Sequence, residues 1–165
     1  MTLDKDFKGY IHDVGGPTAN FTAPACKKQT MVGTCMDKSC LYPSVCKSIE
    51  PDHTDYLKVL RSLRNLEGVK KVFIRSGIRY DYALADKKSG FINEIAKYHV
   101  SGQLRVAPEH VSPKVLSYMK KPEMELFELF SNKFAMASKK AGKEQYVLPY
   151  FISSHPGSTL DDAVM

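Results

Sequence analysis

The chain has 165 residues, of which 43% are hydrophobic and 25% are charged, and its formal net charge is +6. A chain of this length and composition builds a hydrophobic core without disulfides, which excludes a disordered tail, a coiled coil and a collagen-like repeat. No apolar run reaches the roughly 18 residues that a membrane-spanning helix needs, and the N-terminus lacks the apolar stretch of a signal peptide. We therefore expect a cytoplasmic protein that has no membrane partner.

The basic charge is spread along the chain. Lysines occur as single residues and as pairs such as Lys27-Lys28 and Lys120-Lys121, without a long run. Scattered lysines are typical of a solvated surface, so the charge gives only weak support for a nucleic-acid partner.

Four short apolar runs, each ended by turn residues, predict β-strands. They cover residues 9–14, 71–75, 102–107 and 145–152. Apolar side chains at helical spacing predict helices in the gaps between them. These helices cover residues 56–66, 91–96, 113–119 and 122–141, and a last helix begins at a predicted capping box of Ser158 and Asp161.

The order of these elements is strand, long loop, helix, and then strand and helix three more times. Such alternation is typical of parallel strands joined by right-handed helical crossovers. We predict an α/β fold, either an open sheet or a partial TIM-like (β/α) barrel, because about four parallel strands are too few for a complete barrel. So small a sheet leaves a bare edge, and the last helix barely begins before Met165, so we expect a fragment of a larger domain.

Polar and glycine-rich residues follow each predicted strand. They are Gly15-Gly16-Pro17-Thr18, Arg75-Ser76-Gly77-Ile78-Arg79-Tyr80-Asp81, Pro108-Glu109-His110 and Ser153-Ser154-His155-Pro156-Gly157-Ser158-Thr159. Taken singly, each segment has a simpler interpretation: a turn, a surface ion pair between Arg79 and Asp81, or an acid beside a helix N-terminus. Together they predict a ligand-binding rim, because ligands of parallel α/β folds bind beyond the carboxyl ends of the strands. At this rim Glu109 can accept the hydroxyl hydrogens of a ribose.

All four cysteines fall within 21 residues, at Cys26, Cys35, Cys40 and Cys46, with the spacing C-x8-C-x4-C-x5-C. In a cytosolic protein such a cluster favours metal binding over structural disulfides, and thiolates suit zinc or an iron–sulfur cluster. The gaps are wider than those of common zinc ribbons, so free thiols or a redox-active disulfide remain the alternative. We predict that the four-Cys loop of residues 21–50 leaves the first strand on the ligand face and holds a metal near the rim.

Four segments carry a specific combination of motifs. They are residues 9–21 (GYIHDVGGPTANF) followed by the four-Cys loop, 73–81 (FIRSGIRYD), 106–112 (VAPEHVS) and 150–159 (YFISSHPGST). This combination resembles the YgiQ-type (UPF0313) radical S-adenosylmethionine (SAM) proteins over essentially the whole chain. The resemblance implies that residues 1–165 form strands two to five of a six-stranded partial barrel.

The resemblance also implies which residues bind SAM. Gly15, Gly16 and Pro17 match the motif that holds the SAM amino group, although Pro17 stands where the family pattern has Glu. Glu109 matches the residue that contacts the ribose. The segment from Tyr150 to Thr159 matches the one that packs near the adenine, with Ser158 in place of Glu. The other residues expected at SAM are Thr18, Arg75, Ser76, Ser153 and Ser154.

Radical SAM chemistry requires a [4Fe–4S] cluster on a C-x3-C-x2-C loop, and no three cysteines here have that spacing. The resemblance therefore implies that the cluster ligands lie outside this chain and that the chain alone is inactive. It implies that the intact enzyme, with an electron donor, cleaves SAM to a 5′-deoxyadenosyl radical that attacks an unidentified substrate. The four-Cys loop is then a zinc site or a second iron–sulfur site. The alternative is a zinc-binding, basic module that binds nucleic acid.

Overall fold

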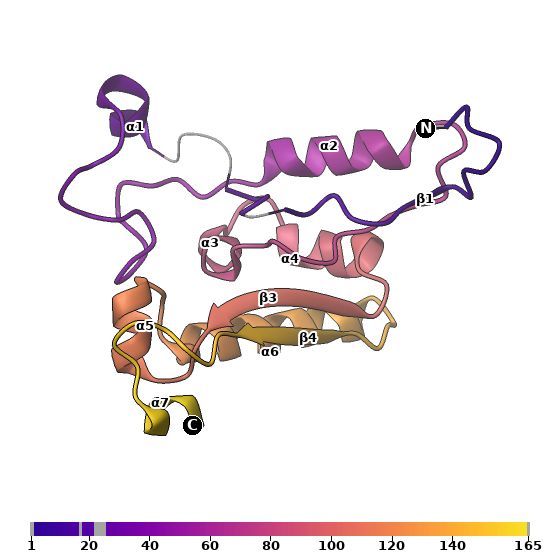
Figure 1. Ribbon diagram of the computed structural model, residues 1–165. Helices are drawn as coiled ribbons and strands as arrows, with labels where there is room; N and C mark the ends of the chain where they lie inside the picture. Colours follow the sequence, from indigo (N-terminus) through magenta and orange to yellow (C-terminus); the bar gives the residue numbers. More distant parts are fainter. Residues whose placement is uncertain (1, 17, 22–25, 165) are drawn as a thin grey trace.

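The computed structural model describes residues 2–16, 18–21 and 26–164 (Figure 1). It is a mixed α/β fold in which short parallel strands alternate with helices. The strands are β1 (Tyr10–Ile11), β2 (Lys71–Val72), β3 (Gln103–Glu109) and β4 (Tyr146–Phe151). The helices are α1 (Lys27–Val32), α2 (Thr54–Arg64), α3 (Tyr80–Ala85), α4 (Phe91–Glu94), the π-helix η1 (Ile95–His99), α5 (Pro113–Met119), α6 (Met124–Lys140) and α7 (Leu160–Val164).

The strands form two sheets of two parallel strands each. Strand β1 pairs with β2, and β3 pairs with β4. The amide of Arg105 donates to the carbonyl of Arg75 at 2.8 Å, so the two sheets meet just beyond the end of β2. The predicted parallel pairing is confirmed, whereas the expected single array of about four strands is divided into two pairs.

The first two strands are shorter than predicted, because regular pairing stops where the Asp13 side chain enters. Strands β1 and β2 have 2 residues each, although the apolar runs extend over residues 9–14 and 71–75. The Asp13 carboxylate accepts hydrogen bonds from the amides of Gly15 and Arg75 at 2.8 and 3.0 Å. These amides bond to a side chain instead of a neighbouring strand, so the two chain segments stay together without a regular ladder.

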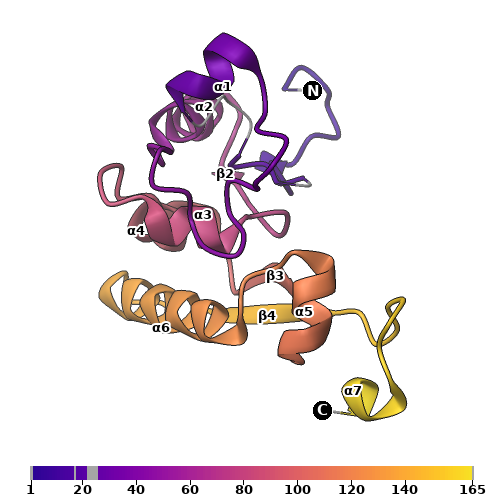
Figure 2. The same cartoon turned by 90° about the vertical axis from the view of Figure 1, so that its left-hand side faces the viewer.

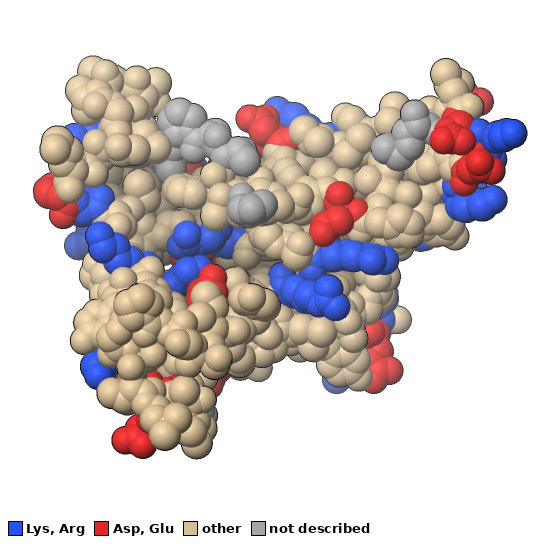
Figure 3. All heavy atoms as spheres, in the orientation of Figure 1, with Lys and Arg blue, Asp and Glu red and all other residues tan. Residues whose placement is uncertain are grey.

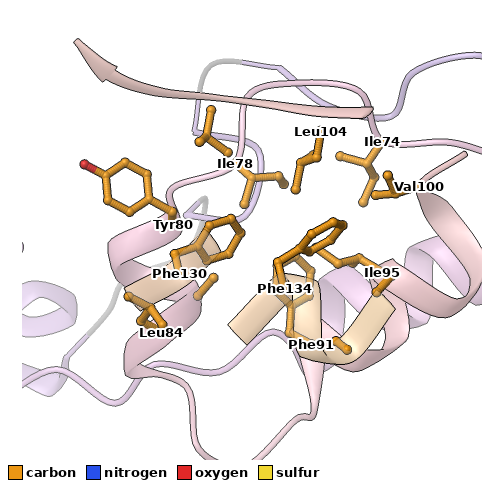
Figure 4. Close-up of a cluster of buried hydrophobic side chains, with 14 of the residues drawn as sticks. Ile74, Ile78, Tyr80, Leu84, Phe91, Ile95, Val100, Leu104, Phe130 and Phe134 are labelled. Atoms are coloured by element: carbon orange, nitrogen blue, oxygen red, sulfur yellow. The ribbon is translucent and has the colours of Figure 1, made fainter. Parts of the chain in front are cut away.

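The main core lies between β3 and the helices α3, α4 and α6 (Figures 2 and 4). Along β3 the side chains of Leu104 and Val106 are buried while those of Gln103 and Arg105 are exposed, which is the alternation expected of a strand with one covered face. The covering helix is α6, whose apolar residues recur every three or four positions and meet the strand. Its fully buried side chains include Phe130 and Phe134. Strand β3 is thus packed along one face, and it ends at Glu109.

The helices confirm some sequence predictions and correct others. Helices α2, α5 and α6 lie where the sequence predicted helices, but α1 and α3 were not predicted. The capping box at α7 is formed by Thr159 and Asp162, one residue later than the predicted pair. The Ser158 hydroxyl bonds instead to the backbone of His155. Among the described helices, none has the length and hydrophobicity needed to cross a membrane.

Candidate ligand-binding site

A pocket of about 340 Å³ opens where β2, β3 and β4 end. Its volume lies at the lower end of the range, roughly 300–1,000 Å³, that is typical of small-molecule sites. It is lined by Thr18, Ser76, Gly77, Ile78, Arg79, Tyr80, Asp81, Arg105, Val106, Ala107, Glu109, Lys121, Pro122 and Tyr150. Basic side chains gather on the surface in the band between the upper part of the molecule and the part that carries β3 and β4 (Figure 3). The pocket therefore combines apolar walls with a few charged groups.

Glu109 occupies an unusual position in this pocket. Its φ is +76°, a left-handed conformation that costs free energy for any residue except glycine. Its carbonyl accepts a hydrogen bond from Ile152 at 2.7 Å, and the register between β3 and β4 shifts between Val106 and Glu109. Its carboxylate forms an ion pair with Lys121 at 3.1 Å. The fold thus holds one carboxylate in the pocket by its backbone and its side chain.

Tyr80 supplies a second polar group. Its side chain is buried, it lines the pocket, and its hydroxyl has no hydrogen-bond partner among the described residues. Figure 4 shows the hydroxyl pointing away from the labelled core residues. Burial raises the pKa of Tyr80, so this hydroxyl stays protonated and can donate. A buried hydroxyl without a hydrogen-bond partner is unfavourable.

The glycine turn after β1 packs closely against the segment that forms the pocket wall. A Cβ added to Gly77, whose φ is +77°, would lie 1.9 Å from the carbonyl oxygen of Gly16. The Asp13 carboxylate also accepts from the Ser76 hydroxyl at 3.1 Å. The turn at Gly15 and Gly16 thus lies directly behind Ser76 and Gly77 and positions them.

Arg79 and Asp81 form an ion pair in which Arg79 Nε lies 3.0 Å from Asp81 Oδ1. The predicted pairing is confirmed, but the pair does not lie on the surface, because Asp81 is buried. Burial alone would lower the pKa of Arg79, but the bonds to Asp81 outweigh it and the pKa is raised. Both groups line the pocket, so the pair forms part of its wall.

The structure brings some of the residues expected at SAM together and separates others. Thr18, Ser76 and Glu109 line the pocket. Gly15 and Gly16 lie behind its wall, and Pro17 is outside the described residues. Arg75 lines a separate hollow with Gln103 and Arg105, and Ser153 and Ser154 are exposed and do not line the pocket.

Sequence reasoning missed Arg105 and Lys121 at the pocket. Arg105 lies inside a strand. Its alternation with the buried residues Leu104 and Val106 was the sequence signal that could have placed its side chain on the open face of the strand. Lys121 follows α5 and reaches Glu109 only through the tertiary fold. No local pattern in the sequence identifies such a contact.

The four cysteines converge although they lie far apart along the loop. All are free and half-buried, and all line one small cavity of about 30 Å³. Burial and then the neighbouring thiols raise the pKa of Cys40, while the Ser48 amide lowers that of Cys46. Within the described part of the chain, no three His, Cys, Asp or Glu side chains already form a metal-binding group.

A buried polar network closes the base of the four-Cys loop. The Asn20 amide nitrogen lies 2.9 Å from His53 Nε2, and the Asn20 side chain also bonds to the backbone N–H and C=O of Arg79. His53 Nδ1 lies 2.7 Å from the Asp86 carboxylate, so His53 donates to Asp86 and accepts from Asn20. The network therefore joins the loop to the start of α3, which lines the pocket.

Comparison with known proteins finds close relatives of this chain. No family model matches the chain, and no solved structure matches it either. A UPF0313 protein of Clostridium perfringens is 58% identical over 165 residues, which is 100% of this chain and 25% of that protein. A UPF0313 protein of Clostridium botulinum is 54% identical over 164 residues, covering 99% of this chain and 26% of that protein.

Over its full length this chain is a close relative of UPF0313 proteins. The predicted similarity to UPF0313 proteins is thereby confirmed by sequence identity over the full chain. The chain spans about a quarter of the length of the UPF0313 relatives that it matches. The pocket, the loop base and the four cysteines therefore lie in the segment that matches UPF0313 proteins.

Proposed function

We propose that this chain is the SAM-binding portion of a radical SAM enzyme, and that its two sheets are neighbouring parts of one partial barrel. Three features support the proposal. The pocket lies at the carboxyl ends of parallel strands, where such folds bind ligands. It contains residues that the family resemblance assigned to SAM, and its polar groups match the chemistry of a nucleoside.

The observation that carries the proposal is that Glu109, an acceptor, and Tyr80, a donor, line the same pocket. The Glu109 carboxylate accepts hydrogen bonds and suits the two hydroxyls of a ribose. The Tyr80 hydroxyl donates and suits a ring nitrogen or a carboxylate. The apolar wall of Ile78, Val106 and Pro122 offers a surface for the adenine. A SAM molecule presents all of these groups.

In radical SAM enzymes a [4Fe–4S] cluster supplies the electron that cleaves SAM to methionine and a 5′-deoxyadenosyl radical. The residues described here hold the nucleoside, orient it and exclude water. The proposal requires an electron donor and a substrate with an abstractable hydrogen. It does not extend to nucleic acid, because Arg79 and Lys121 at the pocket are engaged by Asp81 and Glu109.

Isothermal titration of SAM into the full-length protein tests the proposal. Glu109→Ala removes a charged hydrogen-bond acceptor, and we expect SAM affinity to fall on the order of 10- to 100-fold. Glu128→Ala is the matched control, because it removes the same charge from an exposed position on α6 and leaves the pocket unchanged. Equal SAM affinity in the wild-type and Glu109→Ala proteins would contradict the role assigned to Glu109.

A further inference from the structure

The four-Cys loop carries a second site, separate from the pocket at the strand ends. Cys26 caps the N-terminus of α1, where its sulfur accepts a hydrogen bond from the Gln29 amide at 3.4 Å. The Cys46 amide donates to the carbonyl of Cys40 at 2.8 Å. Together with Cys35, these residues line one cavity. The backbone thus brings four thiols from separate turns of the loop to one place.

The loop has its own packing, so this convergence does not depend on a metal. A small core of Leu41, Ile49 and Tyr82 lies beneath it, and Cys26, Cys40 and Cys46 pack against that core. The bond between Asn20 and His53 closes the loop at its base. A loop held at its base and centre presents its thiols at a low cost in conformational entropy.

The chemistry of the cavity selects a soft, positively charged occupant. Sulfur atoms are its metal ligands, since no carboxylate or imidazole is among its lining residues. Four thiolates around a divalent metal leave a net charge of −2, and Lys28 and Lys38 at the cavity balance it. Four thiolates in tetrahedral arrangement are typical of zinc or iron–sulfur sites.

The ligand set favours zinc over a cluster. Four cysteines that all line one cavity form a closed set of ligands. A closed set of four cysteine ligands around one ion is typical of a structural zinc site.

We propose that Cys26, Cys35, Cys40 and Cys46 together bind one structural zinc ion. Because no metal-binding group is preformed among the described side chains, the thiols have to move to close onto the ion. Binding exchanges four S–H protons for four Zn–S bonds, so one Zn²⁺ enters and four protons leave. The ion cross-links the loop that begins after Thr18 and returns at His53. It takes no part in SAM binding.

Metal analysis of the full-length protein tests this proposal. We expect one equivalent of zinc in the wild-type protein and in Ser44→Ala, which changes an exposed residue of the same loop. The double variant Cys40→Ser/Cys46→Ser should lose this zinc while its iron content is unchanged. Loss of iron in place of zinc would assign a cluster to the loop, and an unchanged zinc content would place the ion elsewhere. Either result overturns the proposal.

A measurement on the wild-type protein remains decisive if the double variant fails to fold. Thiol alkylation is mapped by peptide mass before and after removal of zinc with a chelator, and again after addition of one equivalent of zinc chloride. We expect all four cysteines to be protected by zinc and to react after its removal. Equal reactivity in the loaded and stripped protein would contradict the site. Neither readout depends on SAM, so this proposal and the SAM proposal fail independently.

Discussion

At the scale of single residues, backbone strain gathers beside the pocket. Apart from glycines, three described residues have positive φ: Thr18, Glu109 and Lys120. The first two line the pocket, and the third precedes Lys121, which pairs with Glu109. Such conformations cost roughly 1–3 kcal/mol each and persist where the surrounding structure imposes them. Their location is consistent with a site built for binding.

Tyr80→Phe separates binding from stability. The Tyr80 hydroxyl has no partner among the described residues, so we expect its removal to change the free energy of unfolding by less than about 0.5 kcal/mol. SAM affinity should fall about 10-fold, because a buried donor to the ligand is lost. Urea unfolding and isothermal titration of the full-length protein measure the two effects.

The reciprocal control is Tyr82→Phe. The Tyr82 hydroxyl accepts a hydrogen bond from the Asp52 amide at 3.3 Å and does not line the pocket. Its removal should lower stability and leave SAM affinity unchanged. If Tyr80→Phe destabilised the protein and left binding intact, the hydroxyl would be a structural group and the pocket assignment would lose its donor.

At the scale of secondary-structure elements, the sequence predicted the helices and strands whose spacing of apolar residues can be read locally. Helix α6 shows apolar residues every three or four positions because one face is buried, and it was predicted correctly. Helix α3 was missed because five of its six residues are buried, so no polar face reveals a helical period. Strands β1 and β2 were predicted too long, since the interruption by Asp13 depends on amides from both segments.

The base of the four-Cys loop should make stability depend on pH. Burial lowers the pKa of His53 below its ordinary 6.5, although Asp86 partly opposes this. Burial alone would raise the pKa of Asp86, but bonds from Ser89, His53 and Lys88 lower it to about 2, so Asp86 stays charged near neutral pH. Below pH 6.5 the unfolded chain therefore binds a proton that folded His53 resists, and stability falls as pH falls.

The effect is measured by urea unfolding of the protein at about pH 7.5 and about pH 5.5. Between these two pH values the lowered pKa of His53 contributes at most about 1.4 kcal/mol to the difference, because pH 5.5 lies only about one unit below the ordinary pKa. His53→Gln should be less stable at both values but lose less on acidification. His99, whose pKa burial also lowers, is present in both proteins and supplies the remaining loss. Equal losses in the two proteins would show that His53 does not control this dependence.

At the scale of the whole molecule, the sequence predicted the convergence of strand ends at one pocket better than the residues that line the pocket. Strand ends were expected to converge, and Thr18, Ser76 and Glu109 do line one pocket. Ser154 was expected there too, but the chain after β4 turns outward and leaves it exposed. The direction in which a chain leaves a strand depends on packing with distant elements, such as the Ser112–Asp162 bond at α7.

Hydrogen–deuterium exchange of the full-length protein, with and without SAM, measures whether SAM occupies the pocket at the strand ends. We predict that SAM slows exchange of backbone amides in residues 76–81 and 105–109, which line the pocket. The exposed segment 152–154 should change less. Binding of SAM with no protection at residues 76–81 and 105–109 would show that SAM binds elsewhere, and the absence of SAM binding would overturn the proposed function.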